Sequence, residues 1–156
     1  LVKVLNEVLD NAQKAKQQAK EEKVEILEYE EPVQPESTNT KEYLIQNGVD
    51  MDKALELLGD MEMYNDTIKD FYNELPTKWN RIIEFKNNND MPNYAIDVHS
   101  LKSDCKYLGF MKLADVAYQH ELKSKENDST FINEHFSELE EEYKNVLRIA
   151  TKYLEK

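Results

Sequence analysis

The sequence predicts an all-α protein whose main part is an antiparallel up-down-up-down four-helix bundle. Only 3 glycines and 4 prolines occur in 156 residues, and 33% of the residues are charged, which is typical of long helices. Apolar residues recur at steps of three and four along most of the chain, whereas no segment shows the alternation of a strand. We expect a short N-terminal helix packed at one end of the bundle, with a connecting helix and a linker before it.

Two segments precede the predicted bundle. Residues 1–27 place apolar or small residues at heptad steps, which predicts a connecting helix. Because alanines fill the second half of this pattern, a coiled coil would be weak, and dimerisation through it stays open. Residues 28–47 are acidic, contain prolines and lack a period, so we interpret them as a linker that includes a short helical stretch at 41–46. The bundle domain would then cover 48–156. Since the chain begins at Leu1 inside a helical pattern, we expect it to be a fragment of a longer protein.

Aspartates that can cap helices mark the first elements of the bundle. Asp50 is a natural N-cap for a short helix at 51–58, which ends at Gly59. Asp60 can cap the long helix that follows. Pro76 lies inside this long helix and removes one backbone hydrogen bond, so we expect a bend there rather than a break.

Three further helices complete the pattern. Asp90 can cap the next helix, which should end at Gly109. Another helix of about fifteen residues starts near Met111 and stops in the polar run 126–129. The last helix carries apolar residues at steps of four and three, namely Ile132, Phe136, Leu139, Tyr143, Val146, Ala150 and Tyr153.

The charge and the cysteine content limit the functions that this chain can have. A net charge of -12 argues against nucleic acid and anionic membranes as partners, because both select for an excess of lysine and arginine. The single cysteine, Cys105, can form no disulfide within the chain, which fits a reducing, cytoplasmic setting. The sequence has no apolar run of membrane-spanning length and no signal-peptide pattern, so we expect no membrane contact by this segment.

His99 is the residue whose surroundings best suit chemistry. The sequence has no glycine-rich phosphate loop, no nucleophile elbow and no cysteine pair. The four glutamates within 138–142 lack the Glu-x-x-His pattern of a metal site, so we interpret them as a solvated helix face. His99 lies beside an apolar helical stripe, with Lys102 and Ser103 one turn further along and Lys106 in the turn after that.

The run His99-Ser100-Leu101-Lys102-Ser103, followed after four residues by Leu108-Gly109, resembles the signature of histidine-containing phosphotransfer (HPt) domains. The segments on either side, Leu55-Glu56-Leu57-Leu58-Gly59-Asp60 and Leu113-Ala114-Asp115-Val116-Ala117, resemble the family as well, and the likeness covers about 48–150. The resemblance implies a four-helix bundle that acts as an intermediate in a two-component phosphorelay.

The resemblance also implies roles for single residues. His99 would accept the phosphoryl group on Nε2 as a neutral imidazole, the form that histidine can take near pH 7. Lys102 would offset the phosphoryl charge, and Glu121 would accept the Nδ1 proton. Ser103 stands where the family has glycine; it is small enough to leave the ring accessible, and its hydroxyl could donate to a phosphoryl oxygen. This change keeps an alternative open, a scaffold that binds its partner without accepting phosphate.

Receiver domains of response regulators are the partners that the resemblance implies. The receiver would supply the phosphorylated aspartate and the Mg²⁺, so we expect no cofactor or metal in this chain. The chain would be a phosphocarrier rather than an enzyme, in the cytoplasm by itself or as part of a membrane-anchored sensor kinase. We expect the receiver to dock on the exposed side of 51–58, with Met51 and Ala54, and on the face that carries His99.

Overall fold

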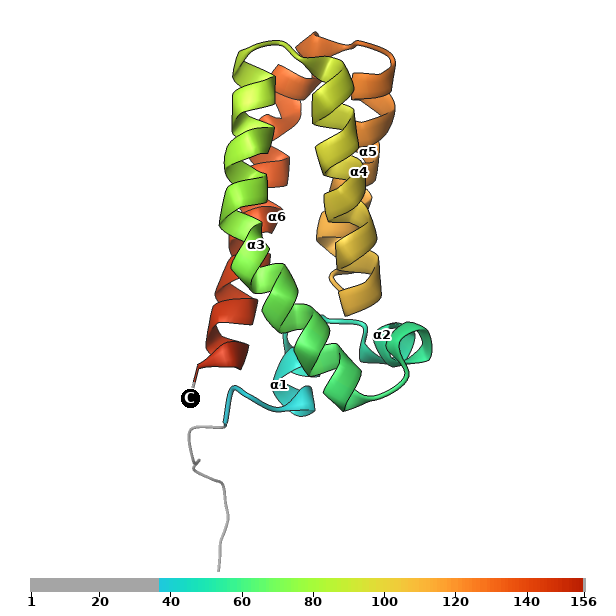
Figure 1. Ribbon diagram of the computed structural model, residues 1–156, viewed down its shortest axis with the longest axis vertical. Helices are drawn as coiled ribbons and strands as arrows, with labels where there is room; N and C mark the ends of the chain where they lie inside the picture. Colours follow the sequence, from blue (N-terminus) through green and yellow to red (C-terminus); the bar gives the residue numbers. More distant parts are fainter. Residues whose placement is uncertain (1–36, 156) are drawn as a thin grey trace, which may run out of the picture. The chain divides into compact units, whose positions relative to one another are not determined.

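The computed structural model of the protein describes residues 37–155, and over this range it contains α-helices and no strand (Figure 1). The prediction of an all-α protein is confirmed. The helices of the described range are α1 (Lys41–Gln46), α2 (Met51–Leu58), α3 (Met61–Asn87), α4 (Met91–Leu108), α5 (Met111–Lys125) and α6 (Ser129–Leu154).

The compact unit starts at Thr38, earlier than the domain boundary at residue 48 that the sequence predicts. Leu44 of α1 has no exposed surface, and the Thr38 hydroxyl donates a hydrogen bond of 2.7 Å to the Lys152 carbonyl at the end of α6. Residues 38–47 therefore belong to the folded unit and not to the linker, because α1 contributes to its core. The predicted connecting helix at 1–27 lies outside the described residues.

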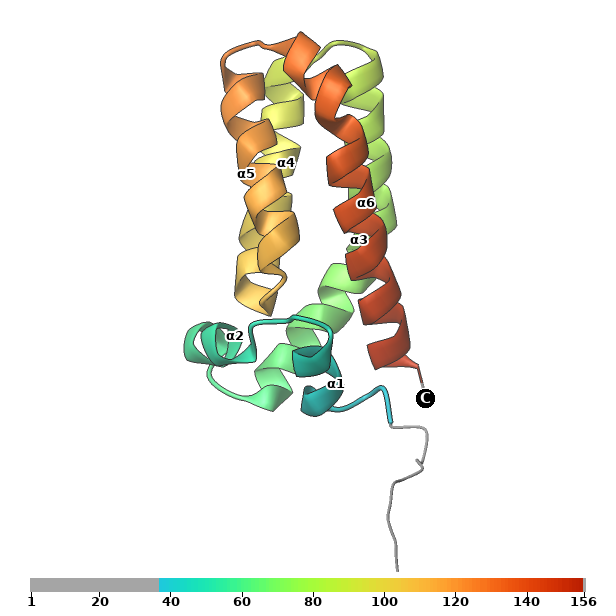
Figure 2. The same cartoon turned by 180° about the vertical axis from the view of Figure 1, so that it is seen from behind.

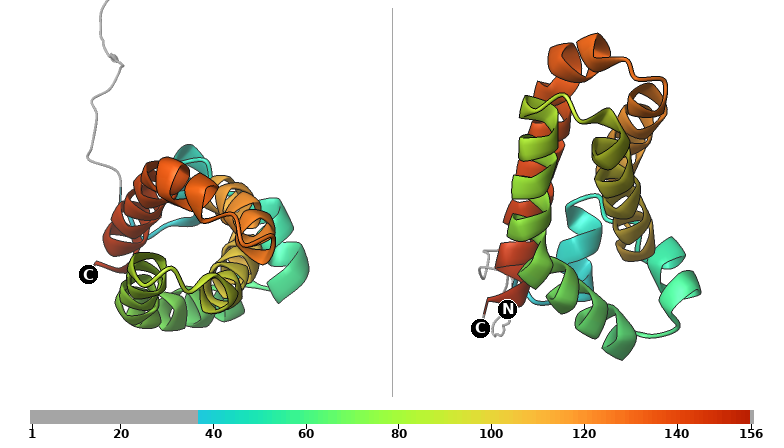
Figure 3. Two further views of the ribbon diagram at one scale, coloured as in Figure 1. Left: turned by 90° about the horizontal axis from the view of Figure 1, so that it is seen from above. Right: turned by 45° about the horizontal axis from the view of Figure 1, so that its top comes forward.

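The longest helices pack against one another in a closed set of contacts. Helix α4 contacts α3 and α5, and α6 likewise contacts α3 and α5. Helices α1 and α2 lie together at one end, where α2 contacts α3 and α4 while α1 contacts α6 (Figures 1 and 2). The view from above shows α3, α4, α5 and α6 around a common interior (Figure 3). Their buried apolar side chains form one core cluster.

Aspartate side chains begin four of the helices. The carboxylates of Asp50, Asp60, Asp90 and Asp128 each accept a hydrogen bond from the backbone N–H three residues further along. The caps that the sequence predicts at Asp50, Asp60 and Asp90 are thus confirmed. Each such cap contributes about 1 kcal/mol by satisfying an amide that the helix itself leaves unpaired.

A backbone hydrogen bond connects the residue after α4 with the residue before α2. Gly109 ends α4 with a φ of 85°, and its carbonyl accepts a hydrogen bond of 2.9 Å from the Asp50 N–H. A Cβ atom at Gly109 would lie 2.6 Å from the Asp50 carbonyl oxygen, so only glycine allows this approach. The position of α2 is therefore tied to the helix that carries His99.

Helix α3 continues through Pro76, as the sequence predicts. Its ribbon changes direction partway along, so that its first turns slant beneath the other long helices (Figure 1). Proline lacks the N–H that would bond to the carbonyl four residues earlier, which accounts for a bend without a break.

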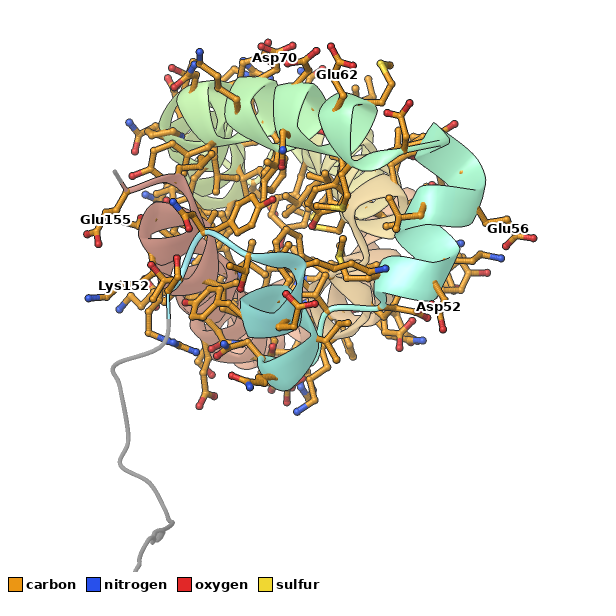
Figure 4. The ribbon with its side chains drawn as sticks, turned by 90° about the horizontal axis from the view of Figure 1, so that it is seen from below. Asp52, Glu56, Glu62, Asp70, Lys152 and Glu155 are labelled. Carbon is orange, nitrogen blue, oxygen red and sulfur yellow. The ribbon has the colours of Figure 1, made fainter. Side chains whose placement is uncertain are left out.

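Helix α2 turns a different side to solvent from the one that the sequence predicts. Met51 and Ala54, expected on the exposed side, are both buried. Figure 4 shows Asp52 and Glu56 pointing outward from this helix, and Leu57 is also exposed. The expectation that Met51 and Ala54 form a docking surface is wrong, because their side chains fill the space against α3 and α4.

Candidate functional site

Helix α4 divides into a buried face and an accessible flank. The predicted apolar stripe is confirmed, since Ala95, Val98, Leu101, Cys105 and Leu108 are all buried. This stripe fixes the rotation of α4. His99 follows Val98 and therefore lies on the flank, where 55% of its side chain is exposed.

Polar contacts with α3 hold the opposite flank of α4. Arg81 of α3 donates two hydrogen bonds to the buried Asp97 carboxylate, at 3.0 and 3.2 Å. Lys78 Nζ donates to Ser100 Oγ at 2.6 Å and to Asp104 Oδ2 at 2.8 Å. These contacts reinforce the orientation that presents His99 to solvent. Nothing in the sequence pattern identified them, because the two helices are paired only in the folded chain.

Glu121 of α5 contacts the His99 ring from the neighbouring helix. Its Oε2 atom lies 2.8 Å from His99 Nδ1, and only 4% of its side chain is exposed. The structure therefore brings together the two residues that the resemblance pairs. A carboxylate from a second helix is fixed by the packing of α4 on α5, so its position does not depend on a flexible surface side chain.

Two lysines also contact the Glu121 carboxylate. Lys102 Nζ of α4 lies 2.7 Å from Oε1, and Lys125 Nζ of α5 lies 2.8 Å from Oε2. Burial alone would raise the pKa of the Glu121 carboxyl, but the hydrogen bonds from Lys102, Lys125 and His99 together outweigh that effect and lower the pKa to about 2. Glu121 is therefore ionised at neutral pH.

The ionised carboxylate determines which ring nitrogen of His99 carries the hydrogen. A carboxylate can only accept hydrogen bonds, so the 2.8 Å contact requires a hydrogen on Nδ1. In the neutral ring the lone pair is then on Nε2. The site thus presents a histidine in one tautomer, with its nucleophilic nitrogen on the side away from Glu121.

A surface pocket of about 510 Å³ adjoins His99. Its walls come from the first half of α4 and the end of α5, and they combine apolar with polar groups. The lining residues are Pro92, Ala95, Ile96, His99, Glu121, Ser124, Lys125 and Asn127. The exposed ring and the ammonium of Lys125 therefore border the same pocket.

Ser103 and Lys106 border a different groove from His99. Together with Lys53 and Leu57 of α2 they line a cavity of about 480 Å³, which His99 does not border. Lys102 points elsewhere, since its ammonium contacts Glu121 and lies 4.9 Å from the centre of the Tyr118 ring. The structure brings together His99, Lys102 and Glu121, but places Ser103 and Lys106 beside α2.

His120, next to Glu121 in sequence, belongs to the core. The Tyr94 hydroxyl donates to its Nδ1 at 2.8 Å, and its Nε2 donates to the His135 carbonyl at 3.2 Å. Burial lowers the pKa of His120 to about 4, so the ring is neutral near pH 7. With both nitrogens engaged, this histidine connects α4, α5 and α6 and has no free atom for chemistry.

Lys125 also belongs to the site, although the sequence pattern did not predict it. The signal was present: Glu121 and Lys125 are four residues apart on one helix, with the acid on the N-terminal side, the favourable arrangement for an ion pair. Because lysines are common on helix surfaces, this spacing becomes informative only once Glu121 is known to be buried beside His99.

Comparisons with known proteins add no assignment. No protein-family model, curated protein or solved structure matches the chain. No helix within 37–155 is long and apolar enough to cross a membrane, and the same range holds no cluster of acidic, histidine or cysteine side chains suited to a metal ion. A function for this chain is therefore inferred from the geometry around His99.

Proposed function

We propose that this chain is an HPt module of a two-component phosphorelay, with α3 to α6 as its antiparallel four-helix bundle and His99 as its phospho-acceptor. The observation that carries the proposal is the contact between His99 Nδ1 and the buried, ionised Glu121, which leaves Nε2 as an exposed nucleophile. The sequence resemblance to HPt domains supports it independently.

The proposed step moves a phosphoryl group from an aspartyl phosphate of a receiver domain to His99. The Nε2 lone pair attacks phosphorus, and the bond between phosphorus and the aspartyl oxygen breaks, so that its electron pair leaves with the carboxylate. The hydrogen on Nδ1 stays in place, and the ring becomes a cation that carries the phosphoryl group. Glu121 stabilises this cation across the 2.8 Å contact, and the reverse step passes the group to a second receiver.

This chain would contribute a nucleophile held in one orientation, and the receiver would contribute the phosphorylated aspartate with its Mg²⁺. The proposed docking face surrounds His99. It includes exposed apolar side chains on both helices of the site, namely Ile96, Tyr118 and Leu122. Such a group of apolar side chains around a charged centre is a common feature of protein-binding surfaces.

The experiment uses phosphoramidate, a small donor that transfers its phosphoryl group to imidazole nitrogen. We expect one phosphoryl group per chain, labile in acid and stable in alkali, and a ³¹P NMR signal of a phosphoryl group on Nε2. The His99→Gln variant should not take up this group. Phosphorylated protein mixed with purified receiver domains and Mg²⁺ should lose the group to aspartate.

His135 supplies a matched control, because it is also partly exposed and has a glutamate at Nδ1. The His135→Gln variant should take up the phosphoryl group like the wild type. Equal rates of labelling at His99 and His135 would contradict the proposal, since they would show the ordinary reactivity of any exposed imidazole. Binding of receivers by a wild-type chain that takes up no phosphoryl group would instead support the non-phosphorylatable scaffold.

A further inference from the structure

The two lysines on Glu121 differ in their freedom to move. Lys102 has only 13% of its side chain exposed and lies against the Tyr118 ring, with its ammonium 4.9 Å from the ring centre. Lys125 has 61% of its side chain exposed and extends from the last turn of α5. Lys125 can therefore change its partner at little cost in packing, whereas Lys102 cannot.

Lys125 is also close to the His99 ring. Its Nζ and His99 Nδ1 both lie 2.8 Å from the same carboxylate oxygen, so these two nitrogens are separated by at most twice that distance. Both residues border the pocket beside His99. A flexible lysine side chain that starts beside the ring can turn towards Nε2 by rotation about its own bonds, without any movement of the backbone.

The charges of the site change when His99 is phosphorylated. The ring becomes a cation, so that Glu121 would face three positive groups, while the new phosphoryl group carries up to two negative charges. Lys102 and the ring are enough to compensate a single carboxylate. Of the other lysines on α4, Lys102 is held between Glu121 and the Tyr118 ring, and Lys106 borders the groove beside α2.

We propose that Lys125 is the phosphoryl-binding lysine of this site: it leaves Glu121 and pairs with the phosphoryl group on His99, while Lys102 stays with Glu121. The inference rests on the proposed function and differs from the role that the sequence resemblance implies for Lys102. The two lysines then have different roles. Lys102 holds the carboxylate that orients the ring, and Lys125 binds the negatively charged phosphoryl group.

The test compares Lys125→Met with Lys102→Met in the phosphoramidate reaction. Lys125→Met should slow phosphoryl uptake about fivefold at low ionic strength, with a smaller effect in high salt, because Lys125 is exposed and its charge is screened. It should also raise the pKa of the bound phosphoryl group, followed by ³¹P NMR over a pH series, because a nearby cation favours the dianion. Lys125→Arg should restore both the rate and this pKa.

Two controls separate this role from a structural one. Lys123→Met removes a lysine from the same turn of α5 that pairs with Glu126, and it should leave the rate and the phosphoryl pKa unchanged. Lys102→Met should lower the stability of the fold more than Lys125→Met does, and shift the phosphoryl pKa less. A larger phosphoryl pKa shift in Lys102→Met than in Lys125→Met would overturn the inference and leave the proposed function intact. A wild-type chain that takes up no phosphoryl group would overturn both.

Discussion

His99 and His135 make the same contact in two different environments. Each ring has its Nδ1 near a glutamate oxygen, at 2.8 Å for His99 with Glu121 and 3.1 Å for His135 with Glu138. Glu121 comes from a second helix and is buried, whereas Glu138 lies three residues after His135 on the same helix and has 61% of its side chain exposed. The carboxylate that comes from a neighbouring helix is thus held in place by packing, whereas the carboxylate from the same helix turn remains exposed to solvent.

The surroundings of the two carboxylates strengthen this difference. Two ammonium groups hold Glu121, while Glu138 has His135 as its partner among the ion pairs of the described range. The His135 ring stacks on Phe131 with a centroid distance of 4.2 Å, so part of it is covered. Of these two histidines, His99 is therefore the one whose Nδ1 contacts a buried carboxylate and whose ring is more exposed.

The largest effect should come from removing the buried carboxylate. Glu121→Ala leaves Lys102 covered and without its partner, and should lower the free energy of unfolding by about 3 kcal/mol. Glu138→Ala should change it by less than about 0.5 kcal/mol, because an exposed pair within one helix contributes little. Urea unfolding of the two variants measures this difference, and similar losses would show that the two glutamates are equivalent.

The buried histidine should make stability depend on pH. The pKa of His120 is about 4 in the folded chain and 6.5 as its ordinary value. Between these values the unfolded chain binds a proton that the folded chain excludes, so stability falls as the pH drops from 6.5 to about 4 and then levels off. The loss should reach about 3 kcal/mol. Urea unfolding at several pH values measures this loss. The free energy of unfolding should depend more steeply on pH in the wild type than in His120→Gln.

Glu121 should make the stability of the fold depend on pH in a lower range than His120 does. Its pKa is about 2 in the folded chain and 4.5 as its ordinary value, so its ionised form stabilises the fold above 4.5. That contribution is lost as the pH falls from 4.5 through about 2. Glu121→Gln should remove this part of the acid sensitivity, and Glu138→Gln should leave it. An unchanged acid profile in Glu121→Gln would contradict the assigned environment.

The smallest effect should follow from the serine at the position where the HPt pattern has glycine. Ser103 borders the groove beside α2 and not the pocket beside His99. Ser103→Gly should therefore leave phosphoryl uptake from phosphoramidate unchanged, and should lower stability by about 0.5 kcal/mol through the helix propensity of glycine. A rate that rises severalfold would instead show that the hydroxyl obstructs the ring.

The parts of this molecule that follow local rules could be predicted from sequence. Aspartate caps, the apolar stripe of α4 and the glycine after it depend on residues within a few positions of each other. The surface that covers α2 could not be predicted: Met51, Ala54, Leu55 and Leu58 are spaced by three and four residues, so the sequence marks an apolar face of this helix but not what that face packs against. Its rotation is set by its contacts with α3 and α4.

The candidate site shows the same limit. The pairing of His99 with Glu121 was predicted through the family resemblance, and the structure places the two in contact. The contacts of Lys102 with Tyr118 and Glu121 depend on how α4 and α5 pack. The contact of Lys125 with Glu121 lies within α5, and it gains its meaning only once Glu121 is placed beside His99. Side chains that meet across two helices leave no period in the sequence, so only the fold reveals them.

The bond from the Asp50 N–H to the Gly109 carbonyl has a consequence for local opening of the chain. Helix α2 cannot separate from α4 unless this amide is released, so the two should open as one cooperative unit. Exchange of the Asp50 amide with deuterium should then occur at the same rate as that of the last amides of α4. The surface beside Ser103 would consequently exist only while the end of the His99 helix is intact.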